Sequence, residues 1–286
     1  MDNIRKIKRI SKSKPTMEGA GVLLKRVFGY NEVPLLDPFL LLDDFHSDNP
    51  DDYIAGFPWH PHRGIETITY MLHGEVKHGD SLGNGGLIRS GDCQWMTAGS
   101  GIIHEEMPQQ KNRLLWGFQL WANLPASQKM MNPRYRDVKK EQIPEISLNG
   151  GKVKVKIIAG EINGTKGPVQ DVVTNPEYLD VTIDSDSEFT HNVTRGHTVF
   201  AYLIEGKCYF DPDSDQLISA ENLVIFDDGD SVRITTEDES VRFLLVSGKP
   251  IGEPVAWYGP IVMNTEEELR TAFEEYRNST FIKYKP

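Results

Sequence analysis

Two residue pairs in the first half of the chain have the types and spacing of metal ligands. The segment "FPWHPHRGIETITY" places His60 and His62 two positions apart, and "GSGIIHEEMP" places His104 and Glu106 at the same separation. In an extended strand, residues two apart point to the same face and lie about 6–7 Å apart along the backbone. Each pair can therefore converge on one ion. Three imidazoles and a carboxylate suit one divalent transition metal, Fe(II) first, with Mn, Ni, Cu and Zn as alternatives.

A second carboxylate competes for the fourth ligand position. Glu66 follows His62 by four residues, so strict alternation would bring it to the same face. The dipeptide Arg63-Gly64 between them favours an interruption of the strand. From spacing alone, Glu66 and Glu106 both stay candidates.

The other histidines have weaker claims on a metal. His73 and His78 flank a predicted hairpin turn, and we expect both on the surface. His46 lies in the acidic segment "DDFHSDNPDD", where solvation is expected. His191 and His197 are six residues apart and have no carboxylate at ligand spacing.

Short β-strands have to position these residues. Segments such as "ETITYMLHGEV", "LLWGFQLWANLP" and "TVFAYLIEGKCYF" are rich in β-branched and aromatic residues and are bounded by Gly, Asp and Pro. Residues 125–150 are polar, contain three prolines and are predicted to be a long loop or linker. The pattern predicts an all-β chain built of sandwiches or barrels.

The strand pattern occurs twice. Residues 72–80 and 203–211 each contain a strand, a turn with Gly and a returning strand, and each is followed by a Gly-Asp turn. Counting back twelve residues from Gly74 reaches His62, whereas the same count from Gly206 reaches Thr194. We therefore expect a metal-binding domain at residues 1–135 and a second domain without metal ligands at 136–286.

One helix is predicted near the C-terminus, at about residues 265–278. Thr265 and Glu268 form a capping box, and three carboxylates in the first turn favour the helix dipole. Leu269, Phe273 and Tyr276 follow at helical spacing and form one apolar stripe. We expect this helix to pack on the outside of a β-domain.

Composition excludes several classes of protein. The chain has 286 residues and a net charge of −11, with 31 Lys and Arg against 42 Asp and Glu, which disfavours direct nucleic-acid binding. Neither a run of about 18 apolar residues nor a secretory signal is present, so we expect no membrane span and a cytoplasmic or nuclear location. Its two cysteines do not form a disulfide framework. Nothing requires an oligomer, and a monomer is expected.

Several long segments resemble the pirin family of the cupin superfamily. They are "DPFLLLDDFHSDNP", "GFPWHPHRGIETITYMLHGEVKHGDSLGN", "SGDCQWMTAGSGIIHEEMP" and "YGPIVMNTEEELRTAFEEY", and they span residue 36 to the C-terminus. The resemblance implies a bicupin, in which two antiparallel β-barrel (jelly-roll) domains stack face to face. It also implies one metal in the N-terminal barrel, held by His60, His62, His104 and Glu106, with Glu66 as a minor competitor.

The resemblance implies two kinds of function. The first is a quercetin 2,3-dioxygenase, which opens a flavonol ring with O₂ and releases CO, with Glu106 as the catalytic base. Phe57, Arg63 and Trp95 are candidates for the substrate pocket, together with Trp59 and Trp116, although each aromatic residue could equally be core. The alternative is a non-catalytic regulatory protein that binds a transcription factor or a metabolic enzyme in a metal- or redox-dependent way.

Overall fold

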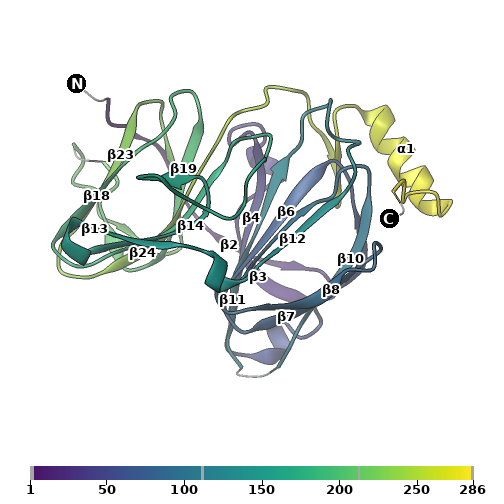
Figure 1. Ribbon diagram of the computed structural model, residues 1–286, viewed down its shortest axis with the longest axis horizontal. Coiled ribbons are helices and arrows are strands. Elements are labelled where there is room, and N and C mark those ends of the chain that lie inside the picture. The colour runs from purple at the N-terminus through teal and green to yellow at the C-terminus, as the bar shows by residue number, and fades with distance from the viewer. Residues whose placement is uncertain (1–2, 111–112, 212, 285–286) are drawn as a thin grey trace. The chain divides into compact units, whose positions relative to one another are not determined.

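The computed structural model describes residues 3–110, 113–211 and 213–284. Apart from one α-helix and four short 3-10 turns, the regular elements of these residues are β-strands (Figure 1). The prediction of an all-β chain with a C-terminal helix is confirmed. The chain divides into two compact units, which we call the first unit (residues 14–140 and 251–286) and the second unit (residues 1–13 and 141–250).

The first unit contains two main antiparallel sheets. Its larger sheet has the strand order β12-β9-β6-β11-β4-β3-β2, and its smaller sheet has the order β5-β10-β7-β8. In Figure 1, strands β7, β8 and β10 form a layer apart from that of β4, β6 and β12. The strands are β2 (Lys14–Glu18), β3 (Val22–Phe28), β4 (Phe39–Ser47), β5 (Phe57–His62), β6 (Ile65–His73), β7 (Glu75–Asp80), β8 (Gly85–Arg89), β9 (Cys93–Thr97), β10 (Ile102–Pro108), β11 (Leu115–Asn123) and β12 (Arg134–Val138).

Alternation along β10 determines which of its side chains face the interior. Ile102, His104 and Glu106 are buried, whereas Ile103 and Glu105 are partly exposed. This is the period of two expected for a strand with one face against a core. The predicted pairing of His104 with Glu106 on one face of the strand is therefore confirmed.

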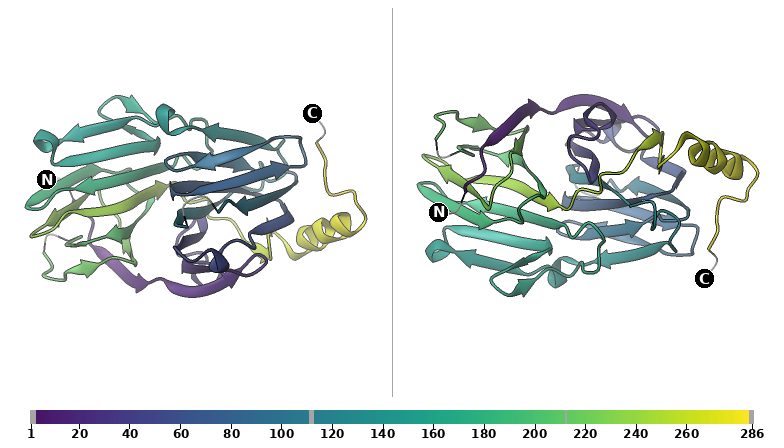
Figure 2. Two further views of the ribbon diagram at one scale, coloured as in Figure 1. Left: turned by 90° about the horizontal axis from the view of Figure 1, so that it is seen from below. Right: turned by 90° about the horizontal axis from the view of Figure 1, so that it is seen from above.

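The C-terminal segment belongs to the first unit. Strands β25 (Ala256–Tyr258) and β26 (Ile261–Met263) form a hairpin that precedes helix α1 (Glu266–Arg277). The helix is capped by Thr265 and Glu268 as predicted, and its buried residues pack against the hairpin. Figure 2 shows α1 beside the strands of this unit in both views. The prediction was two consecutive domains that meet at residue 135. In the observed division, residues 251–286 belong to the first unit together with residues 14–140.

The second unit contains one large sheet of order β1-β22-β19-β24-β17-β14-β13 and three two-stranded sheets. The basic N-terminal segment provides its edge strand, with Ile10 opposite Val224. The strands are β1 (Ile7–Lys12), β13 (Glu145–Leu148), β14 (Val153–Ala159), β15 (Glu161–Ile162), β16 (Thr165–Lys166), β17 (Glu177–Ile183), β18 (Ser187–Asn192), β19 (Thr198–Glu205), β20 (Lys207–Cys208), β21 (Ile218–Ser219), β22 (Asn222–Phe226), β23 (Ser231–Thr236) and β24 (Val241–Gly248).

Residues 125–150 are not a continuous loop, contrary to the prediction. Strands β12 and β13 lie within them, and β12 pairs with β9 along five residues. Both strands lie at sheet edges, and most of their side chains are partly or fully exposed, so they lack the apolar residues that mark a buried strand. Their sequence signal is therefore weak.

Two further features agree with the composition. Within the described residues, no helix has the length and apolar character needed to cross a bilayer. Cys93 and Cys208 are free and buried, one in each unit. Burial raises the pKa of both thiols, which makes them poor nucleophiles.

Candidate metal centre

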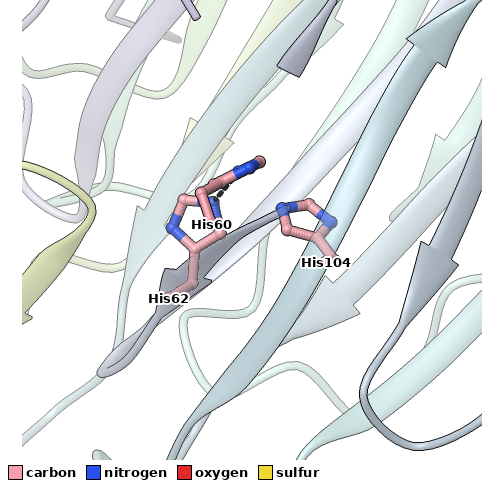
Figure 3. Close-up of side chains that lie close together, drawn as sticks. All are labelled: His60, His62 and His104. Atoms are coloured by element: carbon pink, nitrogen blue, oxygen red, sulfur yellow. Dashed lines mark hydrogen bonds between the residues drawn. The ribbon is translucent and has the colours of Figure 1, made fainter. Parts of the chain in front are cut away.

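Strands β5 and β10 bring three histidines together. Their antiparallel pairing places His104 opposite His60, and opposite residues on neighbouring strands share a face. His62 is two positions further along β5. One ring nitrogen from each of the three lies within 4.8 Å of the others (Figure 3). The predicted convergence of the three imidazoles is confirmed.

Two backbone carbonyls fix the protonation of the β5 imidazoles. The Nδ1 of His60 lies 2.8 Å from the Pro58 carbonyl oxygen, and the Nδ1 of His62 lies 3.0 Å from that of Pro260. A carbonyl oxygen only accepts hydrogen bonds, so each Nδ1 carries the proton. Both Nε2 atoms then present lone pairs, and they face each other at 3.1 Å. Two facing lone pairs repel, and a cation between them would remove the conflict.

The third histidine adds a ring nitrogen without a hydrogen-bond partner among the described residues. This nitrogen is the buried Nε2 of His104. Burial lowers the pKa of His60, His62 and His104, and their mutual proximity lowers those of His62 and His104 further. All three imidazoles are thus neutral at physiological pH, the form that binds metals. The donor set fits a divalent transition metal ion.

Glu106 lies on the floor of the same site but outside the close group of nitrogens. Its carboxylate accepts a hydrogen bond from Thr69 Oγ1 at 3.0 Å and lines the cavity together with His60 and His62. Burial raises its pKa to about 7. The carboxylate is therefore close to the histidines, protected from bulk solvent, and able to exchange a proton near neutral pH.

Glu66 lies elsewhere. It is buried, and its Oε1 accepts a hydrogen bond of 2.6 Å from Thr97 Oγ1 on β9. Gly64 adopts a φ of +79°, a left-handed conformation that ends β5 before β6 begins. This turn breaks the alternation on which the candidacy of Glu66 depended.

A large cavity is lined by His60 and His62. Its volume is about 760 Å³, within the usual range of small-molecule sites. Aromatic and aliphatic side chains form most of its wall, and the polar groups include Gln119, Arg26 and Asp43. The apolar lining residues are Leu24, Tyr30, Leu41, Phe45, Phe57, Pro58, Trp121, Trp257, Tyr258 and Pro260.

The predicted aromatic wall is partly correct. Phe57 lines the cavity, whereas Trp59, Trp95 and Trp116 are not among its lining residues. Trp95 is 1% exposed and belongs to the core, and Trp59 is 52% exposed on the surface. Trp116 stacks on His46 with ring centroids 3.9 Å apart. Of the predicted tryptophans, none faces the site.

The wall contains residues that the sequence analysis missed. Trp121 lies two positions after Gln119 on β11, so strand alternation could have identified it once either residue was placed. Its ring packs edge-on against His62, with centroids 5.0 Å apart. Trp257 packs on Trp121 in turn, at 5.8 Å. No local signal connects Trp257 with the site, because it comes from the distant C-terminal hairpin.

The proposed steering role of Arg63 does not fit its position. The side chain is 2% exposed, forms an ion pair of 2.8 Å with Glu275 on α1, and donates to the carbonyl oxygens of Ser100 and Phe281. Its guanidinium also lies 4.2 Å from the centroid of the Phe281 ring. Arg63 is not among the cavity-lining residues. It instead fastens the C-terminal helix to the end of the ligand strand.

Replacing Glu275 by glutamine is expected to destabilise the protein by about 2 kcal/mol, because it leaves the buried Arg63 charge without its counterion. Glu275 is 23% exposed, so solvent compensates for part of the loss. Urea unfolding of Glu275→Gln measures the effect. Glu274→Gln, the same change on the exposed neighbour, serves as the control. Equal midpoints for the two variants would contradict this role of the ion pair.

Lys129 joins three segments beneath the site. Its buried Nζ donates to the Gly64 carbonyl at 3.0 Å, to Asn123 Oδ1 at 2.7 Å and to the Val262 carbonyl at 3.0 Å. All three ammonium protons are therefore used. Burial lowers the pKa of Lys129 to about 8. The side chain connects the turn after His62 with the C-terminal hairpin that supplies Pro260.

The Lys129→Met variant is expected to lose about 3 kcal/mol of unfolding free energy, because three buried acceptors lose their donor. Its metal affinity should also fall, since the Pro260 carbonyl that orients His62 is attached to the same hairpin. Chemical denaturation and metal titration measure the two effects. Lys77→Met makes the same change at an exposed position of β7. If Lys129→Met had the same unfolding free energy and the same metal affinity as Lys77→Met, this role of Lys129 would be contradicted.

The remaining histidines are placed as follows. His46 and His73 are exposed as predicted. His78 is buried, contrary to the prediction, and its ring lies 2.7 Å from the Tyr135 hydroxyl. Its position opposite Glu106 in the β7–β10 ladder turns it inward. The His191 Nε2 lies 3.1 Å from Glu177 Oε1. Spacing could not reveal this carboxylate partner, because the two residues lie on different strands of the second unit.

Two antiparallel β units, with one histidine cluster on paired strands of the first, define the protein class as a two-domain cupin. The Pirin family profile matches residues 21–122, and the profile of the Pirin C-terminal cupin domain matches residues 178–282. The chain belongs to the pirin family.

Known relatives align with nearly the whole length of this chain. A pirin-like protein from Caulobacter vibrioides is 42% identical over 279 residues, which cover 97% of this chain and 99% of the relative. Pirin from Homo sapiens is 40% identical over 282 residues, covering 98% and 94%. The crystal structure of a quercetin 2,3-dioxygenase from Acinetobacter baumannii superposes with a TM-score of 0.90 at 32% identity, covering 97% of this chain and 98% of that one.

Proposed function

We propose that the chain is a metal-dependent dioxygenase of the quercetin 2,3-dioxygenase type, which opens a flavonol heterocycle with O₂ and releases CO. The observation that carries the proposal is the pair of facing His60 and His62 Nε2 atoms in the wall of an aromatic cavity with Glu106. Similarity to a solved structure described as quercetin 2,3-dioxygenase supports it.

His60, His62 and His104 would hold the ion, with Glu106 as the fourth ligand. Fe(II) is the proposed metal because imidazole and carboxylate together suit it, with Mn, Ni, Cu and Zn as alternatives. When bound, the ion supplies a Lewis acid for the flavonol 3-hydroxyl group and an open position for O₂.

The chain's own residues then have separate tasks. Glu106 would accept the proton of the flavonol 3-hydroxyl group, because its carboxylate lines the same cavity as His60 and His62. Thr69 holds the carboxylate in place by its hydrogen bond. Phe57, Trp121 and Trp257 provide flat apolar walls that would bind the rings of a flavonol and exclude water.

The test uses iron-loaded protein and quercetin. We expect loss of the flavonol absorbance with release of one CO per ring opened, and neither with metal-free protein. Elemental analysis of the same sample establishes that metal is bound. No turnover by metal-loaded protein would refute this function for quercetin. It would favour the alternative, a regulatory protein whose affinity for a protein partner depends on the metal's oxidation state.

A further inference from the structure

A second, much smaller cavity adjoins the first. It has a volume of about 20 Å³, and we call it the side pocket. Phe45, Phe57, Glu106 and Gln119 line both cavities, so the side pocket lies directly behind the wall of the main cavity. The side pocket is thus small enough to hold only about one small molecule.

Most of the side pocket's wall is apolar and firmly packed. Four of its residues belong to one buried cluster that also contacts Phe57. They come from four different strands, so the pocket is formed by the sheets of the unit and not by a loop. The apolar lining residues are Val22, Phe45, Phe57, Val76, Pro108 and Leu115.

The polar lining groups bond to one another. Thr69 Oγ1 lies 3.0 Å from Glu106 Oε1 and 2.8 Å from Gln119 Oε1. A buried water needs two to four polar partners, and an apolar void without them stays dry and accepts apolar guests such as xenon. Because the rest of its wall is apolar, the side pocket favours a small, uncharged, apolar molecule.

We propose that the side pocket binds dioxygen and stores it beside Glu106, at the edge of the main cavity. The inference rests on the proposed function, which requires O₂ as the second substrate. An apolar diatomic molecule gives up no hydrogen bonds on leaving water, so entry into a preformed apolar void is favourable. The lining shared with the main cavity places the stored gas one layer of side chains from the flavonol side.

The test combines xenon binding with oxygen kinetics. Crystals of the wild type under xenon pressure are expected to show xenon in the side pocket. Val76→Ile adds one methylene to the wall and should remove the xenon, and its KM for O₂ should rise about tenfold while its KM for quercetin stays unchanged. Val138→Ile makes the same change at a buried position outside both cavities and should behave as wild type.

A second variant protects the test against misfolding. Val76→Ala enlarges the side pocket and is expected to increase xenon occupancy, and melting temperatures report whether each variant folds. Ordered water instead of xenon in the wild type would overturn the proposal, as would an unchanged KM for O₂ in a folded Val76→Ile variant that has lost its xenon. Quercetin turnover by a wild type that binds no xenon would refute oxygen storage in the side pocket and leave the proposed function intact. Xenon binding without turnover would refute the proposed function and leave the pocket as a site for apolar gas.

Discussion

The His62→Ala variant is expected to lose bound metal and flavonol oxidation together. His62 supplies one of two facing Nε2 lone pairs, and the Pro260 carbonyl holds it in the tautomer that exposes this lone pair. Loss of residues that merely orient a ligand costs about 10–100-fold in metal affinity, so loss of the ligand itself should cost at least about 100-fold. Elemental analysis and the decay of quercetin absorbance measure the two losses.

His73→Ala is the matched control. His73 lies on the same unit but is exposed and outside the cluster, so its variant should keep both metal and activity. Quercetin turnover by metal-free His62→Ala protein would refute the assignment of the site.

The Glu106→Gln variant is expected to keep most of its metal but lose turnover. The three imidazoles remain, whereas the amide cannot accept the proton of the 3-hydroxyl group. General-base catalysis contributes about 10²–10⁴-fold, so kcat should fall by about that factor. The shape of the site is preserved, because glutamine can keep the hydrogen bond with Thr69 that Glu106 now accepts.

Glu105→Gln, one residue earlier on the outer face of β10, is the control and should retain full kcat. Near-normal turnover by Glu106→Gln would eliminate the carboxylate as the base. Complete loss of metal from this variant would instead show that Glu106 acts chiefly as a ligand.

Features defined by near neighbours in the sequence were predictable. The pair His104/Glu106 depends on a period of two that β10 keeps, and the pair His60/His62 has the same spacing in the neighbouring strand β5. Helix α1 was predictable because its cap and its first turn are contiguous. The expectation of a second domain without metal ligands stays a prediction, based on the count back from Gly206 to Thr194.

Features that depend on remote contacts were not predictable from spacing. Gly64 interrupts the alternation of side chains between β5 and β6, so Glu66 does not reach the site. Next to this turn, the Arg63 side chain pairs with Glu275. The Pro260 carbonyl that orients His62 lies 198 residues away in the sequence. Such contacts depend on how complete elements pack together, and no pattern within a short window contains that information.

The return of the C-terminal hairpin to the first unit has a consequence for biosynthesis. His60, His62 and His104 are made long before Pro260, which orients His62, and Trp257, which forms part of the cavity wall. Chains fold largely from the N-terminus during synthesis. A nascent chain that has not yet reached this hairpin thus carries the three histidines without the residues that complete their site, so the finished centre can form only after the hairpin has been made.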